Sequence, residues 1–254
     1  MNHRMSMLRG LGLALGLAGA LASAQAQVSA SGCGSLANGY GPFDYRKATP
    51  KDLAIVEDYH FTPRVEGLLG GTTGPIGGDI AYTLHAYPNH HRALIAMMRV
   101  GERDKTTQPT GARYPVECYM ERAVRFARDD AVALMIYATY LIQNKRDGEA
   151  RARLEKAREI GKENPFTQFN VGMLYFDMKD YERALAQAQL AQRMGFERAT
   201  LKERLQGVGR WKEPGQAHAE PAAAPASAAA SAADASPVGP PPADAPPAAA
   251  SAAP

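Results

Sequence analysis

Small and apolar residues recur at a fixed distance along the middle of the chain. Residues 131–164 (AVALMIYATYLIQNKRDGEARARLEKAREIGKEN) and 165–198 (PFTQFNVGMLYFDMKDYERALAQAQLAQRMGFER) align without a gap at a spacing of 34. The matched pairs are Ala138 with Gly172, Leu141 with Tyr175, Ala150 with Ala184, and Ala157 with Ala191. Small residues let helix backbones approach closely, and short links force antiparallel pairing. Each segment therefore predicts two antiparallel helices.

The period and the places of the small residues resemble the tetratricopeptide repeat (TPR), a helix-turn-helix unit. Residues 165–198 fit best, with NVGMLYF at 170–176, KDYERAL at 179–185 and Ala191. They depart from the family at Gln168, Ala188 and Phe196, where it prefers Trp, an aromatic residue and Pro. The resemblance covers about 97–211. It implies an all-α superhelix of about three units, because one helix pair alone cannot bury its apolar face.

Apolar spacing also predicts helices on both sides of this repeat. Ile80, Leu84, Tyr87, His91, Leu94 and Met98 follow one another at steps of three or four, which predicts one helix over 79–100, bent at Pro88. Residues 114–130 continue the phase of the repeat as the second helix of a preceding unit, begun by Pro115 after an inserted loop. Residues 199–211 predict a capping helix, with Trp211 over the exposed end.

The segment before residue 79 has no such periodicity. Thr49, Pro50 and Asp52 form a helix-start pattern, and Thr62-Pro63 begins a second short helix that Gly70-Gly71 ends. The stretch GGTTGPIGG (70–78) is a connector. It lacks the Lys-Ser/Thr ending of a nucleotide phosphate-binding loop, and no apolar strand precedes it, so a phosphate site there is not expected.

Composition changes the picture at both ends. Arg4 and Arg9, the apolar run 11–22 and the Ala24-Gln25-Ala26 cleavage signal predict a secretory signal peptide, hence a periplasmic or secreted protein. Residues after Pro214 are almost all Ala, Pro, Ser and Gly, which predicts disorder. The expected division is 1–26 signal peptide, 27–78 irregular N-terminal cap, 79–130 degenerate helical repeat with an inserted loop, 131–164 and 165–198 TPR-like repeats, 199–213 capping helix and 214–254 disordered tail.

Charge and cysteine content narrow the class of protein. The formal net charge of +3 is mild and gives no reason to expect nucleic acid as a partner. No apolar segment after the signal peptide approaches membrane length, so no transmembrane span is expected. Cys33 and Cys118 are the only cysteines, and an oxidising compartment favours one disulfide between them. Free thiols, or a lipid on Cys33, are the alternatives.

Three of the six histidines lie within YTLHAYPNHHRAL (82–94). On the predicted helix His91 falls on the buried stripe, His90 on its flank and half-exposed, and His85 off the stripe. A zinc site commonly uses ligands four residues apart on a helix, and His85, His90 and His91 are separated by five, six and one. Packed, hydrogen-bonded imidazoles are therefore favoured. A partner-binding or pH-sensitive role and metal or general-base chemistry remain as alternatives.

The resemblance also assigns a binding face. In TPR proteins the first helices line the concave side, and the residues carried over are Val132, Met135, Thr139, Ile142, Gln143, Phe166, Phe169, Met173, Phe176 and Asp177. Most are apolar, without the Lys and Asn clamp that some family members use for a peptide carboxylate. This face fits an apolar helix or extended peptide. Alternatively, neighbouring helices or the front segment cover it, through Tyr40, Phe43, Tyr45 or Phe61.

The sequence thus predicts an exported, all-α, non-catalytic protein-interaction module or accessory subunit of the bacterial cell envelope. It predicts a protein or peptide partner and no cofactor. The alternative function is a metal-dependent enzyme or metal sensor that uses His85, His90 and His91.

Overall fold

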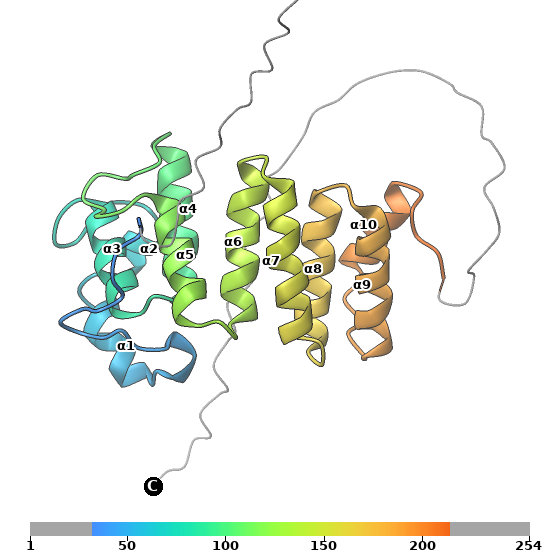
Figure 1. Ribbon diagram of the computed structural model, residues 1–254, viewed down its shortest axis with the longest axis horizontal. Helices are drawn as coiled ribbons and strands as arrows, with labels where there is room; N and C mark the ends of the chain where they lie inside the picture. The colour runs from blue at the N-terminus through green and yellow to red at the C-terminus, as the bar shows by residue number, and fades with distance from the viewer. Residues whose placement is uncertain (1–31, 214–254) are drawn as a thin grey trace, which may run out of the picture.

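The computed structural model describes residues 32–213, and this part of the chain is all-α, without strands. Figure 1 shows its helices standing side by side in one row. The predicted signal peptide (1–26) and tail (214–254) lie outside the described residues. The helices are α1 (Pro50–Glu57), α2 (Pro63–Glu66), α3 (Ile76–Ala86), α4 (His91–Arg103), α5 (Val116–Phe126), α6 (Ala131–Gln143), α7 (Asp147–Ile160), α8 (Pro165–Asp177), α9 (Tyr181–Arg193) and α10 (Thr200–Gly207), with a 3-10 turn at Tyr45–Lys47.

Both 34-residue segments fold into helix pairs, α6 with α7 and α8 with α9. Their shared small residues are buried at the helix contacts: Ala138, Ala150, Ala157, Ala184 and Ala191. A Cβ added to Gly172 would lie 2.6 Å from Leu201 Cδ2, so the glycine lets α10 come close. The predicted close approach of helices at the small residues is thus present.

The first helix of each pair also packs on the first helix of the next. Helix α4 contacts α6, α6 contacts α8, and α8 contacts α10, while α7 lies against α8 and α5 against α6. These contacts place α4, α6 and α8 in one layer and α5, α7 and α9 behind it. One hydrophobic core runs through the whole row, from Phe61 to Leu205.

The predicted bent helix over 79–100 is wrong, because the structure has two helices, α3 and α4, with a tight turn between them. Pro88 has no N–H to continue α3. His90 takes an extended backbone conformation and begins α4 as its N-cap, with its side chain accepting from the Ala93 N–H. The apolar spacing passes through this turn in phase, which is why the break is invisible in the periodicity.

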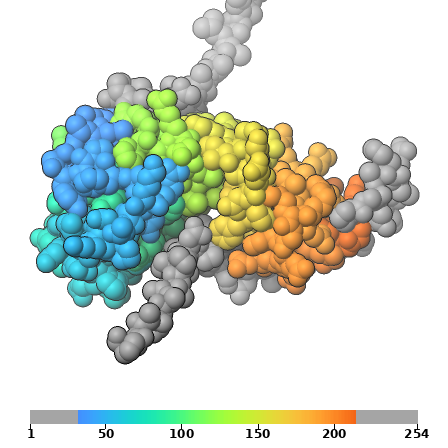
Figure 2. Space-filling model, turned by 90° about the horizontal axis from the view of Figure 1, so that it is seen from below, coloured from blue at the N-terminus to red at the C-terminus, as the bar shows by residue number. Residues whose placement is uncertain are grey.

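The N-terminal segment wraps the α3–α5 end of the row (Figure 2). Helices α1 and α2 begin where predicted, and Thr49 and Asp52 form the expected capping box. Cys33 and Cys118 form the predicted disulfide, which joins this segment to α5. Arg122, almost fully buried, donates to the carbonyls of Cys33 and Ser35. The segment is therefore fixed covalently and by buried hydrogen bonds.

Within residues 32–213, no helix combines the length and apolarity needed to cross a bilayer.

Candidate protein-binding surface

The predicted groove residues occupy two neighbouring helices of the front layer. Met135, Thr139 and Ile142 belong to α6, and Phe166, Phe169, Met173 and Phe176 belong to α8. Because α6 and α8 pack together, these side chains lie on adjacent elements. Their exposure differs: Met135 and Phe169 are buried, at 3% and 5% exposed, and the other five are partly exposed.

The α8 part of this surface is largely covered by the chain that follows α9. The ring of Phe196 lies 6.0 Å from Phe166 and 5.0 Å from Phe169. The guanidinium of Arg204 on α10 lies 4.3 Å from the centre of the Phe176 ring and donates to Asp177 at 2.7 Å. Neighbouring segments thus shield this half, as one of the two expectations proposed.

The front segment covers a different region from the one expected. The Phe43 ring lies 5.0 Å from Tyr40 and 5.5 Å from Tyr87, and Tyr45 packs on His90 at 4.2 Å. Phe61 also contacts His90, at 5.0 Å. These four aromatic residues cover the α3–α4 turn, because the disulfide and the short α1 and α2 hold them at that end.

Helix α4 adds residues that the sequence reasoning missed. It occupies the same place in the layer as α6, and a shift of 40 residues aligns their N-caps, His90 and Asp130. The same shift matches Arg92, Ile95 and Arg99 with Val132, Met135 and Thr139. Ile95 is half-buried against the core, as are Ile142 and Met173. The 40-residue shift would have identified these positions. It is not apparent in the sequence because the loop between α4 and α5 is longer than the loops of the 34-residue units.

At the far end of α4 and α6 the two helices border a small crevice of about 160 Å³. Glu102 from α4 and Gln143 from α6 line it together with Met98 and Tyr140. Side chains from the neighbouring first helices α4 and α6 therefore line one common crevice.

His90 and His91 differ from their predicted exposure. His90 is fully buried, whereas the His91 side chain is 13% exposed. The reversal follows from the turn: as N-cap, His90 points inward, with its Nδ1 accepting from Ala93 and its Nε2 3.0 Å from Glu57 Oε1. Burial lowers the pKa of His90, and the nearby Glu57 only partly offsets this. His90 therefore serves as a neutral structural residue.

His91 contacts the next cap in the row. Its Nε2 lies 2.9 and 3.1 Å from the two carboxylate oxygens of Asp130, and Asn89 donates to the same carboxylate at 2.8 Å. Burial alone would raise the pKa of Asp130, but the hydrogen bonds from His91, the Ala133 N–H and Asn89 keep it below the usual value. This network joins the caps of α4 and α6.

His85 has different surroundings from His90 and His91. Its ring packs 5.9 Å from those of Tyr114 and Tyr119. Burial, together with the charges of Arg122 and Arg113, lowers its pKa to about 4. The three imidazoles thus have separate partners. Among residues 32–213, no group of three His, Cys, Asp or Glu side chains is arranged to hold a metal ion.

Backbone N–H groups of the connector 70–78 form hydrogen bonds within the protein. The Thr72 and Thr73 N–H groups donate to Asp79 Oδ2 at 2.6 and 3.1 Å, and the Thr73 hydroxyl donates to Asp79 Oδ1. His60 Nδ1 lies 3.2 Å from the same carboxylate. These two N–H groups, which a phosphate would need, are thus already bound to Asp79.

No protein-family model matches this chain, and no curated protein sequence matches it significantly.

Proposed function

We propose that this chain is an exported, non-catalytic protein-interaction module, an accessory subunit of an envelope assembly built as a TPR-like superhelix. On this proposal α4, α6 and α8 line its concave face and bind an apolar helix or extended peptide. The 34-residue period and the disulfide, which fits a location outside the cytoplasm, support the repeat fold and the export.

One observation carries the proposal. Ile95, Ile142 and Met173, one from each of three neighbouring first helices, are half-buried side chains at the edge of the core. Partly exposed apolar residues on three adjacent helices offer an apolar ligand several contacts, and methionine adapts to its shape. The face is therefore suited to a protein partner.

The test is a change of polarity at the centre of the row. Ile142→Asp puts a charge in the middle of the proposed contact, whereas Ile160→Asp changes an exposed isoleucine on α7. We expect Ile142→Asp to weaken co-purification of the envelope partner at least about tenfold, with Ile160→Asp as wild type. Thermal melts of both variants check folding. Equal retention of the partner by the two variants would refute the groove.

A further inference from the structure

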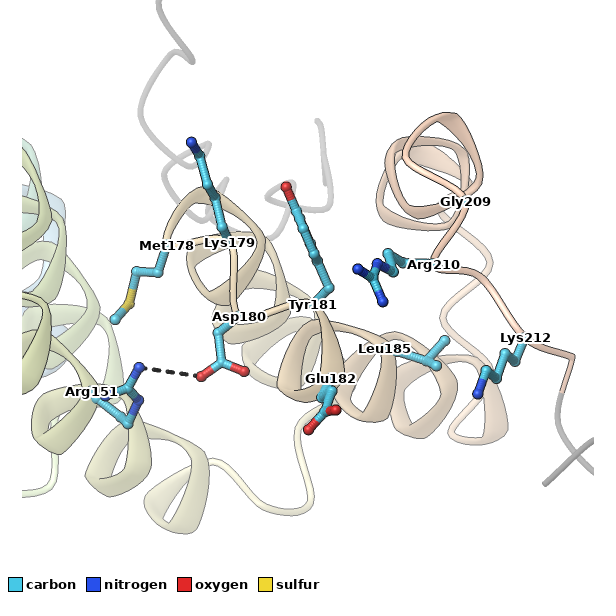
Figure 3. A pocket seen from close by; sticks show the side chains of 10 residues that line it. All are labelled: Arg151, Met178, Lys179, Asp180, Tyr181, Glu182, Leu185, Gly209, Arg210 and Lys212. Carbon is cyan, nitrogen blue, oxygen red and sulfur yellow. Dashed lines mark ion pairs between the residues drawn. The ribbon is translucent and has the colours of Figure 1, made fainter. Parts of the chain in front are cut away.

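The two ends of the row carry surface features that the groove does not use. At one end, an open pocket of about 630 Å³ lies between the start of α9 and the segment that follows α10 (Figure 3). At the other end, α1 and α3 expose large apolar side chains. Figure 1 shows these two regions at opposite ends of the long axis.

The pocket is rich in cations that lack an acidic partner. Lys179, Arg210 and Lys212 line it and form no ion pair within residues 32–213. Arg210 is held only over the Tyr181 ring, 5.8 Å from its centre. Asp180 also lines the pocket. Its carboxylate already forms ion pairs with Arg183 at 2.7 Å and with Arg151 at 3.4 Å. Lys179, Arg210 and Lys212 therefore line the pocket without an ion-pair partner in the described part of the chain.

Its floor is apolar and its charge is not uniform. Met178, Tyr181 and Leu185 line the pocket and are partly buried. Glu182 lies at its margin with no ion pair in the described chain. A complementary ligand would therefore present large apolar side chains, an acid for the cations and a cation for Glu182.

The α1 end presents these groups. Ile55 and Tyr59, one helical turn apart, are 52% and 64% exposed. Between them Asp58 is exposed and has no ion pair in residues 32–213, and Lys51 lies one turn before Ile55. Tyr82 of α3, 43% exposed, extends the apolar area and stacks on His60 at 3.8 Å. This combination mirrors the pocket in both polarity and charge.

We propose that a second copy of this chain docks its α1 end, through Ile55, Asp58 and Tyr59, into the pocket around Tyr181, Arg210 and Lys212. Asp58 then faces the unpaired cations, and the aromatic and aliphatic side chains cover the apolar floor. This contact uses two different surfaces, so it joins copies head to tail and leaves a free surface at each end of the pair.

The chain's own residues 214–254 fit the pocket less well. They carry three acids, Glu220, Asp234 and Asp244, separated by ten or more residues, and a single larger apolar side chain, Val238. Only Asp234 lies within five residues of Val238 in that segment, whereas the α1 end places the exposed Asp58 between two large exposed side chains, Ile55 and Tyr59.

Two complementary double variants test the head-to-tail contact. Asp58→Lys/Tyr59→Ser alters the α1 end and leaves the pocket intact, whereas Arg210→Glu/Lys212→Glu alters the pocket and leaves α1 intact. Sedimentation velocity of the full chain, over a range of concentrations and at low and high salt, gives the mass of each sample. Glu159→Lys and Lys162→Glu, both at exposed positions away from the two surfaces, are the matched charge controls.

We expect wild type and the control variants to associate as concentration rises, and to associate less at high salt. Each double variant should weaken association at least about tenfold. An equimolar mixture of the two double variants should form a dimer, since one has an intact pocket and the other an intact α1 end. Wild type that stays monomeric, or a mixture that stays monomeric while wild type associates, would overturn the proposal. Neither result depends on the groove.

Discussion

At the residue scale, Gly172 marks a close approach of three helices in the packing of the row. It lies in α8 where Leu201 of α10 and Gln187 of α9 approach, with the Gln187 Cβ 3.0 Å from an added Cβ. The sequence identified this place from its small partner Ala138, 34 residues earlier. What it could not give was the neighbour, because contacts with α10 depend on how the capping helix turns back.

Gly172→Leu should therefore lower the free energy of unfolding by about 2–4 kcal/mol, because the larger side chain forces α10 away from α8. Urea unfolding measures this. Gly148→Ala is the matched control: that glycine lies in α7 with open space around it, so alanine should be neutral or stabilising by up to about 1 kcal/mol. Similar effects at the two positions would contradict the close packing of α8 and α10.

Protonation of the buried histidines sets a pH dependence. The pKa values of His85 and His90 are lowered in the folded chain, to about 4 for His85, from an ordinary value of 6.5. Below pH 6.5 the unfolded chain binds protons that the folded chain does not, so stability falls with decreasing pH and the loss continues until pH approaches 4.

Between pH 7.5 and pH 5 we expect a loss of about 1–2 kcal/mol from His85 alone, measured by urea unfolding at both values. His85→Phe, which keeps a ring beside Tyr114 and Tyr119, should reduce this pH dependence. An unchanged pH dependence in the variant would show that His85 is not a buried neutral base.

At the element scale, the sequence predicted most helices but misjudged one boundary. The capping box at Thr49 and the small-residue contacts of α6 to α9 were readable, because local chemistry decides them. The break between α3 and α4 was not, because Tyr87, His91 and Leu94 keep helical spacing across the turn. Pro88 and the N-cap role of His90 mark the break, but a proline also fits a bend within one helix, and histidine is not among the preferred N-cap residues. The same misjudgement reversed the burial of His90 and His91.

The Cys33–Cys118 disulfide ties the N-terminal segment to α5. It closes a loop between residues 85 apart, and both cysteines are buried. Cys33→Ser/Cys118→Ser should lower the free energy of unfolding by about 2–5 kcal/mol. Hydrogen exchange should show faster opening of the segment before α3, while α8 and α9 exchange as in wild type. Uniform acceleration over all helices would contradict a local tether.

At the scale of the whole molecule, the candidate surface was only partly predictable. The resemblance to the TPR assigned the groove positions on α6 and α8, and five of the seven predicted residues are partly exposed. The groove positions on α4 were missed because its unit is 40 residues long. The cover over Phe166 and Phe176 comes from Phe196, at the end of the second repeat where the family prefers Pro, and from Arg204, which lies beyond the repeat. The front segment instead seals the α3–α4 turn, a consequence of the Cys33–Cys118 bond.

The alternative function also belongs at this scale. His85, His90 and His91 face three different sets of partners, so a metal ion would have to break the contacts to Glu57 and Asp130 to bring them together. Metal analysis of the purified chain tests the alternative. Stoichiometric zinc, lost in His91→Ala with the fold intact, would favour the metal site over the interaction module.

The central claim is that a partner binds across α4, α6 and α8. Photo-crosslinking in intact cell envelopes, with the probe placed singly at Ile95, Ile142 and Met173 and at the control positions Ile160 and Val208, tests it most directly. We predict adducts with the same partner from the three front-layer positions, each lost when the partner is absent, and no adduct with that partner from the two controls. Intramolecular crosslinks alone from the front layer, or the same adduct from all five positions, would contradict it.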